Sequence, residues 1–151
     1  MKTNKLTIEE QFLTLEQAKE LKEIGIDFSG AIYCFGKRIK DSRGNKILRQ
    51  KSFLCPSGNH GVRSVLLEQY EFNPTLSVAE MLEMLPKCIE VKDVLYELYF
   101  KKSSFYINEI AYELGYREYL KESLGINKFT HILLRDSLFE MIKWLKQNKL
   151  I

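Results

Sequence analysis

The sequence feature that most constrains the fold is a helix-start pattern that occurs twice. It runs T-L-x-x-A-x-x-L-x-x-[I/L], from Thr14 to Ile24 and again from Thr75 to Leu85, a displacement of 61 residues. In each copy the apolar residues recur every three or four positions, as on one face of an α-helix. Each copy precedes a segment rich in β-branched and aromatic residues, which favours strands. The pattern therefore predicts two halves, each a helix followed by strands.

Both predicted helices carry start and stop signals. Two pairs have the S/T-x-x-E/Q spacing of a capping box, in which side chain and backbone satisfy each other. These pairs are Thr14 with Gln17 and Ser77 with Glu80. Gly25 follows the first helix where a left-handed C-cap residue is expected. Pro86 ends the second helix because proline cannot donate the next backbone hydrogen bond.

A third helix is predicted near the end of the sequence. Its apolar face comprises Leu138, Met141, Ile142 and Leu145. Lysines occupy the far side and the last turn, where the helix dipole favours cations. We expect Asp136 or Ser137 to cap its start, with Glu140 completing a capping box with Ser137.

The remaining segments predict strands. The expected strand segments are 31–35, 47–48, 52–54, 88–91 and 94–100, with a hairpin turn at 41–45. Segment 104–113 alternates like a strand, with a helix from Asn108 as the alternative, and segment 62–72 stays open between strand and helix. The fold class is α+β: helices on a mainly antiparallel sheet, two loosely similar halves (1–72 and 73–151) and a C-terminal amphipathic helix. Without a Gly-, Pro- or Ser-rich linker, a single domain over 1–151 is expected.

Composition limits the protein class. No apolar run approaches the roughly 18 to 20 residues that a membrane span requires. The cysteines, Cys34, Cys55 and Cys88, are odd in number and far apart, which argues against a disulfide framework or a structural zinc site. These features predict a protein of the reducing cytoplasm that is not bound to membranes.

The strongest candidate for a binding site is a basic segment, residues 37–51, called here the basic hairpin. Its cations are Lys37, Arg38, Lys40, Arg43, Lys46, Arg49 and Lys51, against the single acid Asp41. The segment is therefore +6, and because the whole chain is +3, the rest sums to −3. With Arg43 at the tip, Arg38 and Arg49 should lie opposite each other, and Ile39 and Leu48 should face the core. Like charges in that position repel, and a phosphate backbone between them would relieve the repulsion. The alternative is a solvated hairpin that protects a sheet edge.

A second candidate is the loop that holds Cys55, Ser57, His60 and Arg63. A Cys–His or Ser–His pair is the usual composition of an activated nucleophile. Glycines at 58 and 61 could also turn backbone N–H groups toward an anion beside Arg63. The alternative is a glycine-rich connection with an exposed histidine.

The sequence gives weaker indications of a metal site or an aromatic binding surface. The two histidines, His60 and His131, have no ligand-spaced carboxylates near them, so no metal site is predicted. His131 is expected at the edge of a helix or turn. The second half of the chain is rich in tyrosine, which indicates sheet and core packing or an aromatic binding surface. These tyrosines are Tyr96, Tyr99, Tyr106, Tyr112, Tyr116 and Tyr119.

Three segments resemble a group of small bacterial and phage-associated proteins with no established activity. The segments are T-L-E-Q-A-K-E-L-K-E-I-G-I-D (14–27), L-E-M-L-P-K-C-I-E (82–90) and D-S-L-F-E-M-I-K-W-L-K-Q-N (136–148). The matching residues are caps, apolar stripes and a helix stop. The resemblance therefore implies a related scaffold and transfers no functional residue.

Three function classes follow. The leading interpretation is a small non-catalytic module that binds a protein partner, because no catalytic constellation is evident. The alternative is a binder of nucleic acid or another polyanion through the basic hairpin. The third is an enzyme that uses the loop of Cys55, Ser57 and His60. No cofactor is expected, and the sequence leaves the oligomeric state open.

Overall fold

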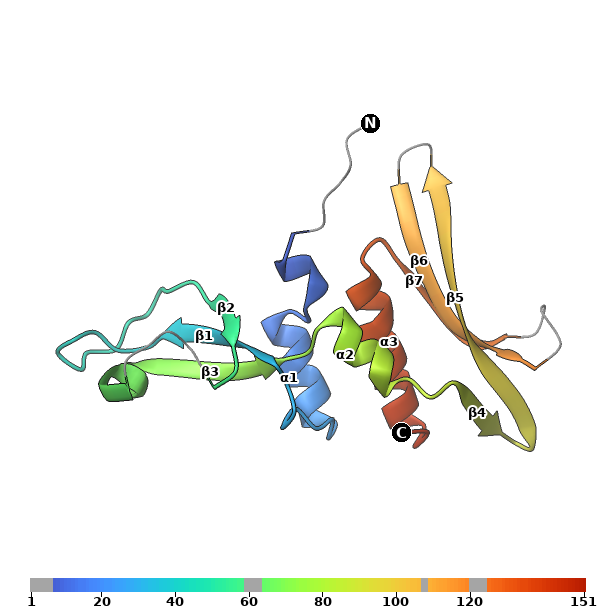
Figure 1. Ribbon diagram of the computed structural model, residues 1–151, viewed down its shortest axis with the longest axis horizontal. Helices are drawn as coiled ribbons and strands as arrows, with labels where there is room; N and C mark the ends of the chain where they lie inside the picture. Colours follow the sequence, from blue (N-terminus) through green and yellow to red (C-terminus); the bar gives the residue numbers. More distant parts are fainter. Residues whose placement is uncertain (1–6, 59–63, 107–108, 120–124) are drawn as a thin grey trace.

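Two antiparallel sheets lie on opposite sides of a helical layer in the computed structural model (Figure 1). The structure describes residues 7–58, 64–106, 109–119 and 125–151. In these residues the α-helices are α1 (Leu15–Glu23), α2 (Val78–Met84) and α3 (Leu134–Gln147), with 3₁₀ helices η1 (Glu9–Gln11) and η2 (Ser64–Gln69). The strands are β1 (Tyr33–Arg38), β2 (Phe53–Pro56), β3 (Tyr70–Thr75), β4 (Cys88–Val91), β5 (Val94–Tyr106), β6 (Glu109–Glu118) and β7 (Gly125–His131). The predicted α+β class is confirmed.

The sheets differ in size and position. One has the strand order β2-β1-β3 and the other the order β4-β5-β6-β7, with every pairing antiparallel. In Figure 1 the three-stranded sheet extends away from the helices on the side opposite to the four-stranded sheet. We call residues 33–75, which include this sheet and its connections, the arm. The predicted hairpin turn and the strand at 88–91 are confirmed.

The two helix starts lie side by side, but in a different register from the repeat in the sequence. Thr14 and Ser77 are the N-caps, each in a complete capping box, so the structural displacement is 63 residues rather than 61. Thr75, which the sequence pattern aligns with Thr14, instead ends β3, and its hydroxyl donates to the carbonyl of Leu13 at 3.0 Å. The N–H of Leu13 donates to the carbonyl of Leu76 at 3.0 Å. Both leucines precede an N-cap and are buried, as expected for hydrophobic staples.

Helix α3 organises the core. Its predicted apolar face is confirmed: Leu138, Met141, Ile142 and Leu145 are all fully buried. The helix contacts β6 and β7 on one side and α1 and α2 on the other. Leu114 and Tyr116 of β6 are also fully buried, and the Tyr116 hydroxyl donates to the carbonyl of Pro86 at 2.7 Å. The core therefore lies between the helices and one face of the four-stranded sheet.

The predicted cap of α3 is wrong. The N-cap is Leu133, and no side chain caps the helix. Ser137 lies inside the helix and is buried, with its hydroxyl donating to the carbonyl of Tyr112 at 2.7 Å, so it cannot form a box with Glu140. Asp136 accepts instead from the Gln17 side chain at 2.8 Å. Tertiary hydrogen bonds therefore replace the local cap.

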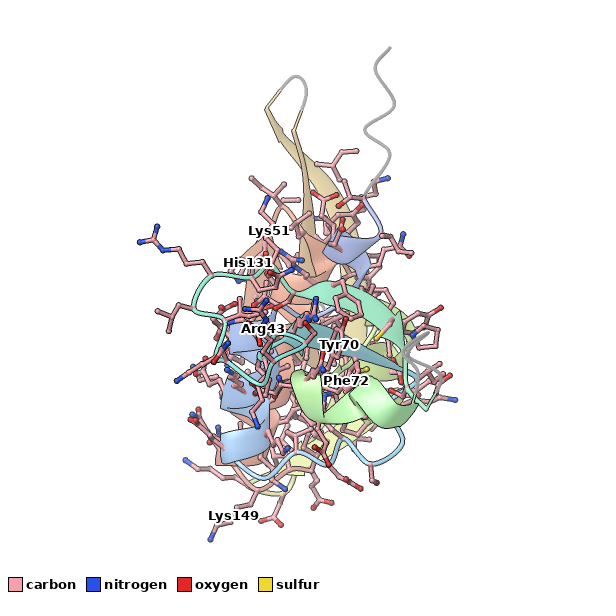
Figure 2. All side chains as sticks on the ribbon, turned by 90° about the vertical axis from the view of Figure 1, so that its left-hand side faces the viewer. Arg43, Lys51, Tyr70, Phe72, His131 and Lys149 are labelled. Carbon is pink, nitrogen blue, oxygen red and sulfur yellow. The ribbon has the colours of Figure 1, made fainter. Side chains whose placement is uncertain are left out.

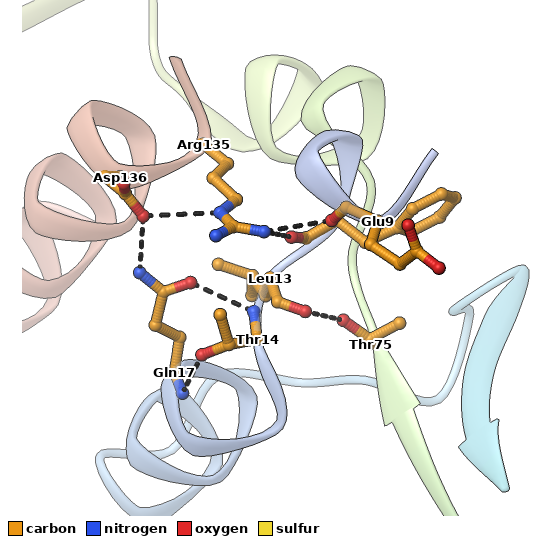
Figure 3. Close-up of polar contacts among 8 residues, drawn as sticks. Glu9, Leu13, Thr14, Gln17, Thr75, Arg135 and Asp136 are labelled. Carbon is orange, nitrogen blue, oxygen red and sulfur yellow. Dashed lines mark hydrogen bonds and ion pairs between the residues drawn. The ribbon is translucent and has the colours of Figure 1, made fainter. Parts of the chain in front are cut away.

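Arg135 ties the N-terminal turn to α3 (Figure 3). One guanidinium nitrogen, Nη1, donates to the carbonyls of Glu9 at 2.9 Å and Phe12 at 3.2 Å. The Nε atom lies 3.4 Å from the Asp136 carboxylate, which also receives the Gln17 amide. The capping side chain of α1 is thus linked to the first turn of α3.

Several strand predictions needed correction. Segment 104–113 is not one strand: it contains the end of β5 and the start of β6, and residues 107 and 108 between them lie outside the described residues. In segment 62–72, residues 62 and 63 lie outside the described residues, and the rest comprises η2 and the start of β3. Residues 47–48 are not in a strand, and His131 ends β7 rather than a helix or turn. In segment 104–113 the two strands pair with each other, Ser104 opposite Ile110, so both contribute to one alternating pattern. Strands β3 and β7 pair with strands outside their own segments, which local periodicity does not reveal.

None of the helices among the described residues has the length and apolarity needed to cross a membrane.

Candidate functional site

The basic hairpin lies at the arm, and five of its cations are exposed. Lys40, Arg43, Lys46, Arg49 and Lys51 are exposed, while Lys37 and Arg38 are half-buried. Figure 2 views this end of the molecule, with Arg43 and Lys51 on the loop in front of the strands. Within the described part of the chain, none of the seven cations has a carboxylate within the 4 Å of an ion pair. Among the described residues, the five exposed cations therefore contact solvent rather than a counter-ion.

The tip of the hairpin is held by its single acid. Asp41 Oδ1 accepts the N–H groups of Arg43 and Asn45, both at 2.8 Å. Gly44 adopts the left-handed conformation that the turn requires, with φ +82°. The hydrogen bonds from Asn45 lower the pKa of the Asp41 carboxyl, and Arg38 lowers it further. Asp41 is thus engaged in the turn, and the lysines and arginines flank a defined tip.

The expected opposition of Arg38 and Arg49 is wrong. The hairpin pairs Lys40 with Lys46, and the N–H of Ile47 donates to the carbonyl of Ile39 at 2.8 Å. Arg38 pairs instead with Tyr70 of β3, whereas the pairing of β1 with β2 ends at Gly36. Leu48, expected to face the core, has 81% of its surface exposed.

A like-charge pair does exist in the corrected register. Lys40 and Lys46 face each other across the hairpin, and both are exposed. Like charges directly opposite destabilise a ladder. An anion between these two ammonium groups would remove that repulsion.

Three aromatic side chains lie next to the basic hairpin and were not predicted as part of a site. Phe53 of β2 and Phe72 of β3 lie over Gly36 of β1, and Tyr70 of β3 contacts both rings. We call these three side chains the aromatic cluster; Figure 2 shows Tyr70 and Phe72 at the same end of the molecule as Arg43. Tyr70 and Phe72 fall in the segment whose state was left open. The spacing of two between these aromatic residues is typical of one face of a strand, but the sequence does not show that this strand pairs with β1.

The loop of Cys55, Ser57, His60 and Arg63 remains untested as a catalytic site. His60 and Arg63 lie outside the described residues. Ser57 is exposed, and its backbone N–H donates to the carbonyl of Ile32 at 2.8 Å. Burial, together with the neighbouring Cys34, raises the pKa of the Cys55 thiol to about 11. A thiol with this pKa is almost entirely protonated at neutral pH, so it is a poor nucleophile there.

Two cysteines that are distant in sequence are neighbours in the structure. Cys34 and Cys55 pair directly across β1 and β2, with their Sγ atoms 3.5 Å apart, and both are buried thiols that are not joined in a disulfide. Their separation of 21 positions along the chain gave no sign that these two residues face each other across neighbouring strands. Cys88 is exposed and also free.

An open pocket of about 630 Å³ lies on the face of the four-stranded sheet opposite α3. Its lining comprises Tyr99, Lys101, Glu113, Arg117, Gly125, Ile126, Asn127 and Lys128. The Tyr99 hydroxyl donates to Glu113 at 3.0 Å, and burial and this carboxylate raise the pKa of Tyr99 to about 12. Arg117 is bound by Glu97 at 3.0 Å, and Lys128 lies 3.5 Å from Glu113. The charges are largely paired and the phenol stays protonated at neutral pH, so the pocket offers no activated group.

The described residues contain no group of three or more side chains suited to hold a metal ion. Comparison of the chain with protein-family models, with curated proteins and with solved structures finds no match. The relation to phage-associated proteins therefore stays a prediction, and the case for function depends on the geometry of the chain itself.

Proposed function

We propose that the protein is a non-catalytic binding module whose arm binds nucleic acid or a similar polyanion through the basic hairpin. The observation that carries the proposal is the dense group of cations in the basic hairpin. Seven basic side chains occur within 15 residues, five are exposed, and none has an ion-pairing carboxylate among the described residues. Such a group attracts a polyanion by releasing the counterions bound to it.

The rest of the molecule favours binding at the arm alone. The chain outside the basic hairpin sums to −3, so it repels a polyanion, whereas the arm projects away from the helices (Figure 1). If the five exposed cations each neutralise one phosphate, the logarithm of the binding constant should fall with the logarithm of salt concentration. The expected slope is about −3.5 for a single strand and about −4.5 for duplex DNA.

The test is a salt series on a variant of the exposed cations. Lys46→Gln combined with Arg49→Gln removes two charges, and both side chains are exposed and in no ion pair among the described residues. Binding to DNA and to heparin should weaken, and the slope should fall by about 1.4 to 1.8. The matched control is Lys19→Gln with Lys22→Gln, which changes net charge equally on exposed positions of α1. No binding by the wild-type protein at low salt would refute the proposal, as would equal losses in both variants.

A protein partner is the second candidate, and exposed apolar side chains favour it. Phe100 of β5 is 51% exposed and stacks on Tyr112 with ring centroids 6.0 Å apart. Ile110 is 44% exposed and lies on the same face of β6 as Tyr112. Exposed aromatic and aliphatic groups of this kind occur at protein interfaces.

A pull-down of the tagged protein from its native host separates the two candidates. Under the polyanion proposal, co-purifying proteins should disappear after nuclease treatment and should be absent with the Lys46→Gln, Arg49→Gln variant. Proteins that remain after nuclease treatment and are lost with Phe100→Lys would instead support the protein partner.

A further inference from the structure

The aromatic cluster is built around a glycine of the central strand. Gly36 pairs with Phe53 on one side and with Phe72 on the other, so the two phenyl rings and the glycine share one face of the sheet. A Cβ atom at Gly36 would lie 2.5 Å from the Phe53 ring and 2.9 Å from the Phe72 ring. The rings therefore occupy the space over the glycine, against the backbone of β1.

Tyr70 extends this aromatic surface toward the hairpin. Its ring stacks on Phe72, with centroids 6.1 Å apart and an interplanar angle of 14°, and meets Phe53 edge-on at 6.2 Å and 81°. Phe53 is 38% exposed, and Tyr70 and Phe72 are half-buried. Solvent thus reaches part of an aromatic surface whose rings hold one another in place.

Positive charge joins this surface directly. Arg38 lies opposite Tyr70 on the same face, and its guanidinium is held by donating to the carbonyl of Lys40 at 3.1 Å and to the Gln69 side chain at 3.2 Å. The acid of β3, Glu71, pairs with Lys37 on the opposite face of the sheet and accepts a hydrogen bond from the Asn73 side chain at 3.1 Å. The aromatic face therefore continues into the basic hairpin without a carboxylate from β3.

We infer that the aromatic cluster stacks on unpaired nucleobases, so that the arm binds single-stranded nucleic acid in preference to duplex. This inference rests on the proposed polyanion binding and adds the substrate class. Proteins that bind single strands combine a cationic track for the backbone with aromatic side chains on which bases stack. The bases of a duplex already stack on one another, so their faces are closed to a protein ring. Cations alone would give no such preference, because duplex DNA has the higher charge density.

The test compares three probes on one protein: a 20-nucleotide oligothymidylate or oligouridylate, a DNA duplex of equal length, and heparin. The wild-type protein should bind the single strands more tightly than the duplex at the same salt concentration. Phe53→Leu keeps an apolar side chain and removes the ring, and it should weaken single-strand binding about five-fold or more, the lower end expected for one lost base stack. Its affinity for heparin and for the duplex should not change.

Two further measurements complete the design. Phe100→Leu is the matched control, because Phe100 is an exposed aromatic residue on the other sheet, and it should bind all three probes like the wild type. Photo-crosslinking of the wild-type protein to a bromouracil-containing oligonucleotide needs no variant, and the adduct should map to Phe53 or Tyr70.

The outcomes separate this inference from the proposed function. Equal single-strand binding by Phe53→Leu and the wild type, or an adduct confined to the lysines, would overturn base stacking while heparin binding still supported the basic hairpin. A wild-type protein that bound none of the three probes would refute both proposals.

Discussion

Removal of the Arg135 guanidinium should destabilise the protein more than removal of any exposed cation. The Arg135 side chain is only 16% exposed, and it bridges α3 to the N-terminal turn through the carbonyls of Glu9 and Phe12 (Figure 3). A hydrogen bond to a charged group contributes about 1.5 to 3 kcal/mol. The hydrogen bond to the Glu9 carbonyl is exposed, so water can replace it. The hydrogen bond to the Phe12 carbonyl is partly buried, so its loss should remove its whole contribution to the free energy of unfolding.

We therefore expect Arg135→Met, which retains an apolar stem of similar length, to lower the free energy of unfolding by about 2 to 3 kcal/mol. With a urea m-value of about 2 kcal/mol/M, the midpoint should fall by about 1 to 1.5 M. Arg135→Lys should fall in between, because one ammonium cannot reproduce the planar fork of the guanidinium.

The assay is urea unfolding followed by circular dichroism at pH 7. Lys128→Met is the control, because the Lys128 side chain is 65% exposed, and its ion pair with Glu113 should contribute less than about 1 kcal/mol. The reasoning fails if Arg135→Met shifts the midpoint no more than Lys128→Met, with both m-values equal to that of the wild type.

Three other predictions concern the sheets and thiols. Gly115→Ala should lower the free energy of unfolding in urea by about 1 to 3 kcal/mol, since its Cβ would lie 2.8 Å from the Tyr99 ring and from the carbonyl of Asn127. Gly30→Ala, whose Cβ would have no atom within 4 Å, should lower it less. Equal losses in the two variants would contradict this reasoning. A thiol reagent should label only Cys88 in the folded protein and all three cysteines in urea; rapid labelling of three thiols in buffer would show that the two others are not buried. The free energy of unfolding should fall as pH rises from 9 to about 11. The pKa of Cys55 is raised from 9.0 to about 11 in the folded protein, which therefore retains a proton that the unfolded chain releases, and the raised pKa of Tyr99 extends the loss toward pH 12. A urea midpoint that stays constant over this pH range would refute the linkage.

Local signals in the sequence predicted the helices well. The capping boxes of Thr14 and Ser77, the C-cap at Gly25 and the buried face of α3 depend on residues within one or two turns of each other, and all are confirmed. The start of α3 was missed because Ser137 and Asp136 bond to distant partners, Tyr112 and Gln17. A hydrogen bond across 119 residues leaves no periodic trace in the sequence.

The candidate surface on the arm was predicted in part, for a similar reason. The cations of the basic hairpin are contiguous in sequence, so composition was enough to find them. Their register was predicted one residue away from the observed Lys40–Lys46 pairing, because the turn and not the charge pattern sets it. The aromatic cluster was not predicted because it depends on the pairing of β3 with β1, which are distant in sequence. Of the loop at 55–63, the residues after Gly58 lie outside the described residues.

The charge distribution bears on how a polyanion would lie on this protein. The repeated helix start has a structural role in the core, because Leu13 and Leu76 are buried and the N–H of Leu13 donates to the carbonyl of Leu76. The basic hairpin and the aromatic cluster, neither of which belongs to the buried core, both lie on the arm. Exposed charges are screened beyond about 8 to 10 Å at physiological salt. A bound strand would therefore respond to the +6 of the basic hairpin where it touches the arm and to the −3 of the remaining chain wherever it approached the helices. This asymmetry favours a path along the arm and across its aromatic face, and disfavours wrapping around the body.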